Sequence, residues 1–339
     1  MSHQPTPPEQ IFQICLSFLA PISLNVVANL SVADHLAGGP KHVDEIARAA
    51  KANPDALYRI LRALTTTGVF QEVEPRRFAQ TPTSDLLRSD HPQSLRPFVL
   101  FFPDPLHYRF YSNLMHSVKT GETTAKPTVG KELFDWLREH PAESAIFNAG
   151  MVNVTQMFIP AALEAYDFSG TRTLVDVGGG HGSVVGAILQ KYPQMKGILF
   201  DLDHVVEGAP LYLKAQGVLD RCQIQSGDFF KSVPAGGDTY IMKNIIHDWD
   251  DERSITILKN IASRLKGNPS GKVVLLEFAL TPGNEPQIGK WADIEMLALP
   301  GGRERTEDEY RELFKRSGLR LTRVVPTQAP QSVIEAVLE

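Results

Sequence analysis

The sequence predicts an α/β protein in which a mainly helical part precedes a doubly wound, parallel sheet. Two observations carry this prediction. Residues 43–70 show two amphipathic helical patterns and are followed by a hairpin signal at Glu74-Pro75. After Phe168-Ser169-Gly170 the hydrophobic pattern changes to short apolar strands that alternate with helices, which is typical of a parallel sheet covered on both faces.

The first helical pair is joined at Ala52-Asn53-Pro54. The apolar residues of each helix share one face, which comprises Ile46, Ala47 and Ala50 in the first helix and Leu57, Ile60, Leu61 and Leu64 in the second. Helix, turn, helix and hairpin in this order predict a winged-helix module.

Residues 11–33 carry no charged side chain and are long enough to span a bilayer. However, Pro21 interrupts the segment, and polar side chains such as Gln13, Ser17, Ser23, Asn25 and Asn29 are scattered along it, which argues against a membrane span. We therefore expect a helix pair that is buried against another chain, and hence a homodimer. The first ten residues contain no lysine or arginine, so the charged region of a signal peptide is missing.

The composition is that of a globular protein. Of the 339 residues, 42% are hydrophobic and 22% are charged, which excludes disordered and collagen-like classes and leaves room for two domains. The two cysteines, Cys15 and Cys222, suit a reducing, cytoplasmic compartment. The net charge of -5 gives no excess of positive charge that would bind nucleic acid. Between residues 31 and 90, eight basic residues are balanced by eight acidic ones.

The second half of the chain predicts five strands, which are residues 173–178, 196–202, 222–228, 238–244 and 272–280. Residues 105–165 are mainly helical. We therefore expect a winged-helix dimerisation domain over residues 1–105, a helical connection over residues 106–165 that contributes to a substrate pocket, and a Rossmann-like domain over residues 166–339.

The first of these strands ends in a glycine-rich loop at residues 178–182, where the backbone can turn tightly and approach a ligand. The third glycine of a nicotinamide-binding loop is missing, because Ser183 or Val185 stands at its position. The second strand ends in Asp201, where a carboxylate can bind ribose hydroxyls, and Asp228-Phe229 follows the third strand, where a nucleobase fits. Together these strand ends predict an adenosine pocket.

Five segments follow one another in a specific order: LVDVGGGHGS, ILFDLDHV, SGDFF, YIMKNIIHDWDDE and GGRERTEDEYRELF. This pattern resembles that of class I S-adenosylmethionine-dependent O-methyltransferases of the plant caffeic-acid and isoflavone type, and of their bacterial relatives that act on small molecules. The resemblance covers nearly the whole chain. Its specific signals are IMKNIIHDWDD and GGRERT, whereas the glycine loop alone is not specific.

The resemblance implies a Rossmann-like methyltransferase domain, a winged-helix dimerisation domain, S-adenosylmethionine as the methyl donor and no metal ion. Cofactor contacts are implied at Gly178, Asp201, Leu202, Asp228, Phe229 and Lys243. Acceptor contacts are implied at Phe147, Met151, Asn244 and Met296. The implied catalytic residues are His247 as general base and Glu277 and Glu304 beside its imidazole.

His247 suits this role because methylation of a hydroxyl needs the oxygen deprotonated as it attacks, and an imidazole with a pKa of about 6.5 can accept that proton near neutrality. A carboxylate on the other ring nitrogen would fix the tautomer. Two alternatives stay open: Glu304 could pair with Arg303 or Arg305 on the surface, and Asp248 could cap the following helix. We see no further cluster of carboxylates that would hold a magnesium ion.

The expected acceptor is a small hydroxylated molecule, with an aromatic one favoured. Phe147 and Met151 lie one helical turn apart and could line a flat apolar slot. Leu299-Pro300 and Glu295 depart from the plant pattern, so the acceptor stays undefined. The alternatives are an N-methyltransferase, a relative that binds the cofactor without transferring methyl, and a winged-helix regulator that senses a metabolite; His247 favours oxygen, since a neutral amine needs no base.

Overall fold

The computed structural model describes residues 5–339, so the start of the N-terminal segment analysed for a signal peptide lies outside the described residues. The chain divides into two compact units. Residues up to 109 and residues 142–153 form the first unit, and residues 110–141 and 154–339 form the second. This division passes through the expected connection of residues 106–165, whose contribution to a substrate pocket stays a prediction.

The first unit is mainly helical. Its elements are α1 (Pro7–Leu16), α2 (Leu19–Asn29), α3 (Val32–Leu36), β1 (Lys41–His42), α4 (Val43–Ala50), α5 (Pro54–Thr65), β2 (Phe70–Glu74), β3 (Arg77–Gln80), α6 (Pro82–Asp85), α7 (Arg96–Phe101), most of α8 (Pro105–Tyr111) and the first half of α12 (Pro141–Ala165). The three short strands form one sheet in the order β1-β3-β2. The predicted helix pair is α4 and α5, and the predicted hairpin is β2 and β3.

Local chemistry explains the boundaries of α5. The Asn53 side chain accepts hydrogen bonds from the N–H groups of Asp55 and Ala56 at 3.1 and 3.0 Å, which caps the helix start. The predicted apolar face of α5 is buried in the core of the unit, although Ile60 is only half-buried. Between the strands of the hairpin, Arg76 takes up a left-handed turn with a φ of 62°.

The second unit contains the large sheet. Its elements are α9 (Leu114–Thr120), α10 (Ala125–Val129), α11 (Leu133–Glu139), the second half of α12, β4 (Thr173–Val177), α13 (Ser183–Lys191), β5 (Lys196–Asp201), α14 (Asp203–Val206), α15 (Ala209–Ala215), η1 (Leu219–Arg221), β6 (Cys222–Ser226), β7 (Thr239–Lys243), η2 (Ile246–Asp248), α16 (Asp251–Leu265), β8 (Lys272–Glu277), β9 (Ala279–Leu280), α17 (Gly289–Ala298), β10 (Arg305–Thr306), α18 (Glu307–Arg316), β11 (Leu319–Pro326) and β12 (Ser332–Leu338).

The sheet has seven strands in the order β11-β12-β8-β7-β4-β5-β6. The five predicted strands are β4 to β8 and run parallel to one another. The last of them ends at Glu277 and not at residue 280, because residues 279–280 form β9, which pairs with β10 in a separate two-stranded sheet. The last two strands of the chain were not predicted: β12 pairs antiparallel with β8, and β11 pairs antiparallel with β12. They make the sheet mixed, because an antiparallel pair needs only a short loop and no crossover helix.

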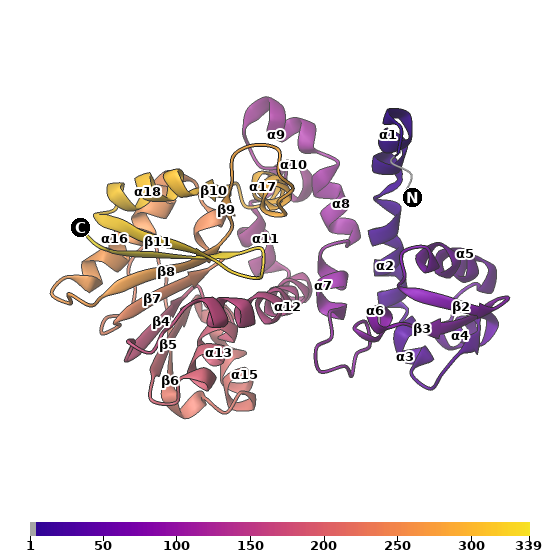
Figure 1. Cartoon of the computed structure of the whole chain (residues 1–339), viewed down its shortest axis with the longest axis horizontal. Coiled ribbons are helices and arrows are strands. Elements are labelled where there is room, and N and C mark those ends of the chain that lie inside the picture. The colour runs from indigo at the N-terminus through magenta and orange to yellow at the C-terminus, as the bar shows by residue number, and fades with distance from the viewer. Residues whose placement is uncertain (1–4) are drawn as a thin grey trace. The chain divides into compact units, whose positions relative to one another are not determined.

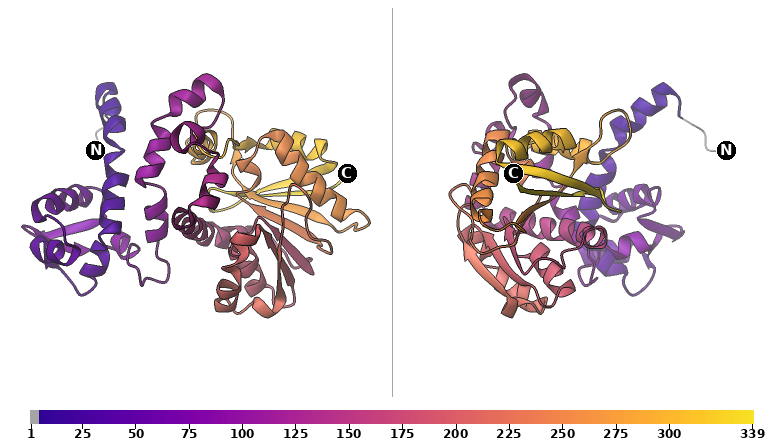
Figure 2. Two further views of the ribbon diagram at one scale, coloured as in Figure 1. Left: turned by 180° about the vertical axis from the view of Figure 1, so that it is seen from behind. Right: turned by 60° about the vertical axis from the view of Figure 1, so that its left-hand side comes forward.

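Helices cover both faces of this sheet, as the doubly wound prediction requires. Neighbouring residues of β4 point to opposite faces: Val175 packs in the cluster that contains α16 and α18, and Leu174 in the cluster that contains α12, α13 and α15. Figure 1 shows these two helical layers on either side of the sheet, and Figure 2 shows the same layers from behind. The carboxyl ends of the parallel strands therefore meet at one edge, from which the loops of the candidate site extend.

Two segments of the described chain, Pro7–Asn29 and Pro141–Ala165, are long and apolar enough to cross a membrane by length and composition alone. Core helices of soluble proteins meet the same criterion. The first of these segments contains most of the uncharged stretch for which we expected burial against another chain. That expectation is wrong for the second half of the stretch, because Val27, Ala28, Val32 and Ala33 pack in the core of the chain's own first unit, whereas no residue of α1 is buried.

Candidate active site

The glycine-rich loop follows β4 at the carboxyl edge of the sheet. Gly178 has a φ of 71°, and a Cβ placed on it would lie only 2.5 Å from Cδ1 of Ile245, so a side chain there would conflict with both the backbone and the space. Below the loop, Oδ2 of the buried Asp176 accepts the N–H of Val185 at 3.0 Å. Burial raises the pKa of Asp176 to about 7.

Asp201 ends β5 and holds two loops together. Its Oδ2 accepts the N–H of Gly180 at 2.8 Å, and its Oδ1 accepts the N–H of Leu202 at 2.7 Å. Burial raises the pKa of this carboxyl group, although both N–H groups act in the opposite direction. Each carboxylate oxygen can accept a further hydrogen bond, so this side chain can still bind a ligand that carries hydroxyls.

Beyond β6, Asp228 and Phe229 lie beside an aromatic cluster that the sequence analysis did not single out. The Phe229 ring meets Phe230 at 4.9 Å and Trp249 at 6.1 Å between centroids, both nearly edge to face. Nδ2 of Asn260 donates to the carbonyl groups of Phe229 and Phe230 at 2.8 and 3.0 Å, which fixes this loop on α16. Trp249 follows His247 by two residues, so its nearness to the site was a signal available in the sequence.

Lys243 and Asn244 end β7. Burial lowers the pKa of Lys243 to about 8, although the carboxylates of Glu277 and Asp176 oppose this effect. Asn244 has a left-handed backbone with a φ of 54°, and its side-chain Oδ1 accepts a hydrogen bond from Gln331 in the loop between β11 and β12. The unpredicted strands therefore bring a residue to the edge of the candidate site.

His247 lies in η2 and is only 5% exposed. Its Nδ1 is 2.7 Å from Oε1 of Glu304 and 3.5 Å from Oε2 of Glu277, while Nε2 is 3.5 Å from Oδ1 of Asp248. The three segments that carry His247, Glu277 and Glu304 are far apart in the sequence. The structure thus brings all three predicted catalytic side chains together in one buried cluster.

Glu277 also shapes the backbone around His247. It ends β8, and its Oε1 accepts the N–H groups of Ile245 and Ile246, each at 3.0 Å. The carboxylate therefore satisfies two backbone donors at the start of the turn, and the buried N–H of Ile246 would otherwise have no acceptor.

The structure decides the two alternatives that the sequence left open for Glu304 and Asp248. Glu304 is 2% exposed and bonds to His247, whereas Arg303 pairs with Glu309. A surface pair between Glu304 and a neighbouring arginine is therefore wrong. The cap of α16 is Asp250, whose Oδ1 accepts the N–H of Arg253 at 2.8 Å, so Asp248 is not the cap.

The electrostatics around His247 differ from the expectation of an ordinary imidazole. Burial alone lowers the pKa of His247, but the carboxylates of Glu277, Glu304 and Asp248 together outweigh it and raise the pKa to about 10. Burial also raises the pKa of Glu277, and that of Asp248 to about 7. With this pKa the imidazole is protonated at neutral pH. The sequence could not show this, because Glu277 and Glu304 come from segments that are far from His247 along the chain.

The same cluster corrects the expectation that no further carboxylates gather here. One potential ligand atom each from His247, Glu277 and Glu304 lies within 4.8 Å of the others, close enough to hold a metal ion. Nδ1 of His247 and Oε1 of Glu304 are, however, already bonded to each other at 2.7 Å. The expectation that no metal takes part stays a prediction.

The predicted acceptor residues are divided between the units. Met296 lies buried on α17 and Asn244 follows β7, both in the second unit. Phe147 and Met151 lie one turn apart on the part of α12 that belongs to the first unit, where the Phe147 ring meets Phe101 edge to face at 5.3 Å. Their contact with an acceptor stays a prediction. Glu295 accepts a hydrogen bond from the hydroxyl of Tyr111.

Two family models match the chain: the O-methyltransferase domain over residues 111–320 and the O-methyltransferase dimerisation domain over residues 12–90. The phenazine O-methyltransferase of Lysobacter antibioticus is 41% identical over 326 residues, which are 96% of this chain and 95% of that protein. The 8-amino-8-demethylriboflavin N,N-dimethyltransferase of Streptomyces davaonensis is 30% identical over 332 residues, which are 97% of this chain and 95% of that protein.

Solved structures agree with these matches. The crystal structure of LaPhzM superimposes with a TM-score of 0.93 at 40% identity and covers 98% of this chain and 100% of its own. An O-methyltransferase from neocarzinostatin biosynthesis, solved with S-adenosylmethionine and 2-hydroxy-5-methyl naphthoic acid, has a TM-score of 0.81 at 28% identity and covers 100% of both chains. The chain therefore belongs to the O-methyltransferase family and is an S-adenosylmethionine-dependent enzyme with the family's dimerisation and methyltransferase domains.

Proposed function

We propose that this enzyme methylates a hydroxyl oxygen of a small aromatic molecule and that His247 is the general base. The observation that carries the proposal is the 2.7 Å contact between Nδ1 of His247 and Oε1 of Glu304 inside a buried cluster. This contact assigns one ring nitrogen to the carboxylate and leaves Nε2 for the acceptor hydroxyl. Glu304 is then the residue that orients the ring, and Glu277 holds the turn beneath it.

The loops at the carboxyl edge fit S-adenosylmethionine. The glycine loop leaves open space at Gly180, where a Cβ would meet no atom within 4 Å, and Asp201 can accept the ribose hydroxyls. Asp228 and Phe229 are the proposed contacts of the adenine, with Leu202 and Lys243 as the remaining proposed contacts. When bound, the cofactor supplies an electrophilic methyl group on a sulfonium centre.

The raised pKa of His247 suits a phenol as acceptor. A phenolic hydroxyl has a pKa of about 10, as in tyrosine, and the carboxylates bring that of His247 to about 10 as well. In the neutral form of His247, whose fraction grows as the pH rises toward 10, a proton can pass from the acceptor to Nε2 with little cost, and the imidazolium formed stays paired with Glu304 and Glu277. A base contributes roughly 10²–10⁴-fold, whereas correct alignment of the reacting atoms can supply about 7–11 kcal/mol.

We propose a planar, hydroxylated aromatic acceptor, since the relatives' names include a phenazine and one relative was solved with a naphthoic acid. Phe147, Met151, Asn244 and Met296 are its proposed contacts. Glu295 would add a carboxylate, which favours an acceptor that donates a hydrogen bond or carries positive charge. A screen of phenolic aromatics with a labelled methyl donor tests this class, and methylation of purely aliphatic alcohols alone would contradict it.

N-methylation is the second candidate, because one relative of 30% identity is an N,N-dimethyltransferase. A neutral amine attacks without a base, so this reading does not need the contact between His247 and Glu304. It predicts that removing the imidazole leaves turnover close to wild type. A metabolite-sensing regulator is disfavoured, since the winged-helix segment has no excess of basic residues.

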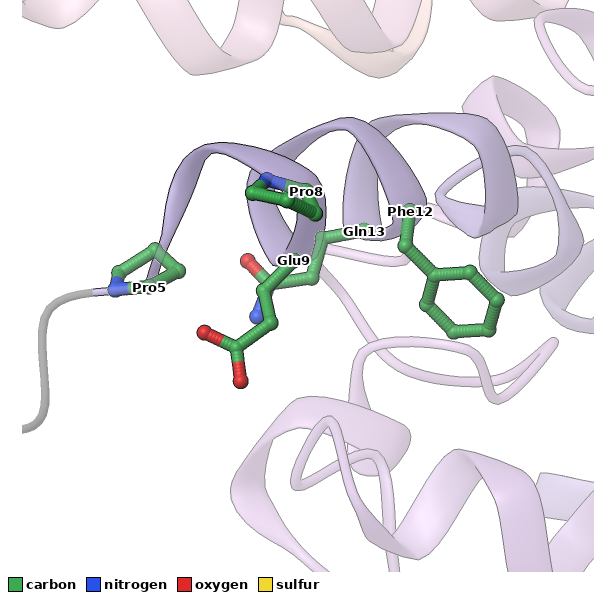
Figure 3. A pocket seen from close by; sticks show the side chains of 5 residues that line it. All are labelled: Pro5, Pro8, Glu9, Phe12 and Gln13. Atoms are coloured by element: carbon green, nitrogen blue, oxygen red, sulfur yellow. The ribbon is translucent and has the colours of Figure 1, made fainter.

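We propose that two chains associate through α1 and that the enzyme acts in the cytoplasm without nucleic acid or membrane partners. The dimerisation-domain match supports association. None of the residues of α1 is buried, and Ile11, Phe12 and Ile14 are 65 to 66% exposed. The hollow in Figure 3, about 430 Å³, is lined only by residues 5–13 and lies beside Phe12 and Glu9. A hollow that is lined by one helical segment is too open to be the acceptor site. It is consistent with a surface that a helix of a second chain covers.

We also propose that no metal ion takes part, because Nδ1 of His247 is already hydrogen-bonded to Oε1 of Glu304. Dialysis against EDTA should leave turnover unchanged. A loss of turnover that Mg²⁺ restores would contradict this.

The decisive experiment replaces His247 with alanine and measures methyl transfer to an acceptor whose hydroxyl pKa is well above the assay pH. Turnover should fall by roughly 10²-fold or more while cofactor affinity stays nearly intact. His91→Ala is the matched control, because His91 lies in the first unit beside Asp85. Near-wild-type turnover of His247→Ala would remove the imidazole from the mechanism and favour the nitrogen acceptor.

A further inference from the structure

We propose that Arg305 is a positioning residue for methyl transfer. Its buried guanidinium fixes the backbone turn that carries His247 and thereby sets the imidazole against Glu304. The inference rests on the proposed role of His247 as general base. In the sequence, Arg305 was considered only as a surface partner of Glu304.

The guanidinium of Arg305 bridges the backbone on both sides of His247. The residue is 1% exposed, although arginine is among the residues that are least often buried. Nη1 donates to the carbonyl oxygen of Ile246 at 3.1 Å, and Nη2 donates to that of Trp249 at 2.9 Å. Nη2 and Nε also contact Oδ1 of Asp251, at 2.8 and 3.2 Å. The charge is thus paired, and the fork spans the turn from the residue before His247 to the second residue after it.

The neighbouring backbone completes this clamp. The N–H of Arg303 donates to the carbonyl oxygen of His247 at 2.8 Å. A Cβ placed on Gly302 would lie 1.9 Å from that same oxygen, so only glycine permits this approach. Residues 302–305 therefore lie directly against the turn. The same short loop supplies Glu304 to Nδ1, which means that any shift between loop and turn changes the 2.7 Å contact on which the base depends.

The chemistry requires a guanidinium at this position. Arginine presents five donors in a rigid plane, so one side chain can serve two carbonyl groups and a carboxylate at once. Lysine is a point charge that can satisfy only part of this set. Ser254 is the other side chain near both carbonyl groups, with its Oγ 3.3 Å from the oxygen of Ile246 and 3.4 Å from that of Trp249. These longer contacts cannot replace the fork.

The test measures steady-state kinetics and cofactor affinity of Arg305→Met and Arg305→Lys. Misplacing a catalytic group by about 1 Å can cost roughly 10²-fold, so we expect kcat of Arg305→Met to fall by about 30-fold or more. Arg305→Lys should recover part of this loss. The dissociation constant for S-adenosylhomocysteine should change by less than about twofold. Arg316→Met is the control, because Arg316 pairs with Glu252, next to Asp251, yet contacts no carbonyl group of the turn.

A double-variant cycle separates positioning from stability. If Arg305 acts through His247, then Arg305→Met adds no further loss of kcat to His247→Ala, whereas a general loss of structure would reduce it again. If Arg305→Met does not fold, Arg305→Lys takes its place in the cycle. Wild-type kcat of the Arg305 variants, or fully additive losses, would overturn the inference while leaving His247 as the base. Wild-type turnover of His247→Ala would instead overturn the proposed function.

Discussion

The turn that carries His247 and the helix α1 differ in how completely one chain satisfies them. In the turn, the N–H groups of Ile245 and Ile246 bond to Glu277, and the carbonyl group of His247 bonds to the N–H of Arg303. In α1, no residue is buried, and the ring of Phe12 is among the exposed apolar side chains. These backbone groups of the turn are satisfied within the chain, whereas α1 displays apolar surface that a second molecule would cover.

This difference teaches where the two parts of the function are encoded. By the proposal above, the chemistry belongs to a cluster of His247, Glu277 and Glu304 inside the second unit. Association, as proposed, belongs to α1 of the first unit, whose apolar side chains are exposed. Changes at the two places should therefore separate in experiment, with turnover affected by the first and oligomeric state by the second.

The largest expected effect is that of Glu304→Gln on turnover. Glutamine keeps the shape but removes the charge that orients and stabilises the imidazolium, so turnover should fall by about 10²-fold. The carboxylate of Glu304 also raises the pKa of His247. Without it that pKa falls, so the pH range over which the rate rises moves to lower pH, although the maximal rate is smaller.

A pH–rate profile with an acceptor of high pKa measures both effects. In the wild-type enzyme the rate should still rise above pH 7, because the pKa of His247 is about 10. Glu312→Gln, on the exposed side of α18, is the matched control and should change neither quantity. A Glu304→Gln profile that coincides with the wild-type profile would show that the carboxylate does not act on the base.

At α1, the corresponding change is Phe12→Asp. A charge in the middle of an apolar interface should weaken association by at least about 30-fold, because it removes a buried ring and adds an unpaired carboxylate. Light scattering at micromolar concentration should give the mass of a dimer for the wild-type protein and a smaller mass for the variant. Val73→Asp is the control, since Val73 is a 43% exposed side chain on β2 of the same unit. Equal masses for both variants would remove α1 from the interface.

Asp201→Ala should weaken cofactor binding by at least about tenfold, or roughly 1.4 kcal/mol. The carboxylate holds the N–H groups of Gly180 and Leu202 and, as proposed, the ribose hydroxyls. Isothermal titration with S-adenosylhomocysteine measures the loss. Asp203→Ala, two residues further along and exposed, should bind like the wild-type enzyme. Unchanged affinity of Asp201→Ala would refute the ribose assignment.

The smallest expected effects are changes in the free energy of unfolding when the caps of two helices, α16 and α1, are removed. Asp250 caps α16, which packs in the core, so Asp250→Ala should cost about 1 kcal/mol in the free energy of unfolding. Glu9 accepts the N–H of Thr6 at 2.7 Å on the exposed α1, and Glu9→Ala should cost less than about 0.5 kcal/mol. Urea denaturation of both variants decides this, and equal losses would mean that α1 is as firmly part of the folded unit as α16.

Much of the fold followed from local patterns. The periodicity of residues 43–70 predicted α4 and α5, and the apolar runs after residue 170 predicted the five parallel strands. The strands β11 and β12 were not predicted. They form an antiparallel edge of the sheet, so they lack the alternation of strand and helix that indicated the five parallel strands. In the site, the glycine loop and Asp201 could be predicted because strand ends of a parallel sheet meet at one edge.

By itself the sequence determined the family, the order of the elements and the residues of the candidate site, because periodicity, strand-end chemistry and the segments around His247 and Glu304 are all legible along the chain. Only the tertiary structure decided how these residues act on one another. The pKa of His247 depends on burial and on carboxylates from distant segments, and the buried place of Arg305 depends on a loop that meets the turn in space. The exposure of α1 was decided there too, since an uncharged helix is equally compatible with a core and with an interface, and only packing distinguishes the two.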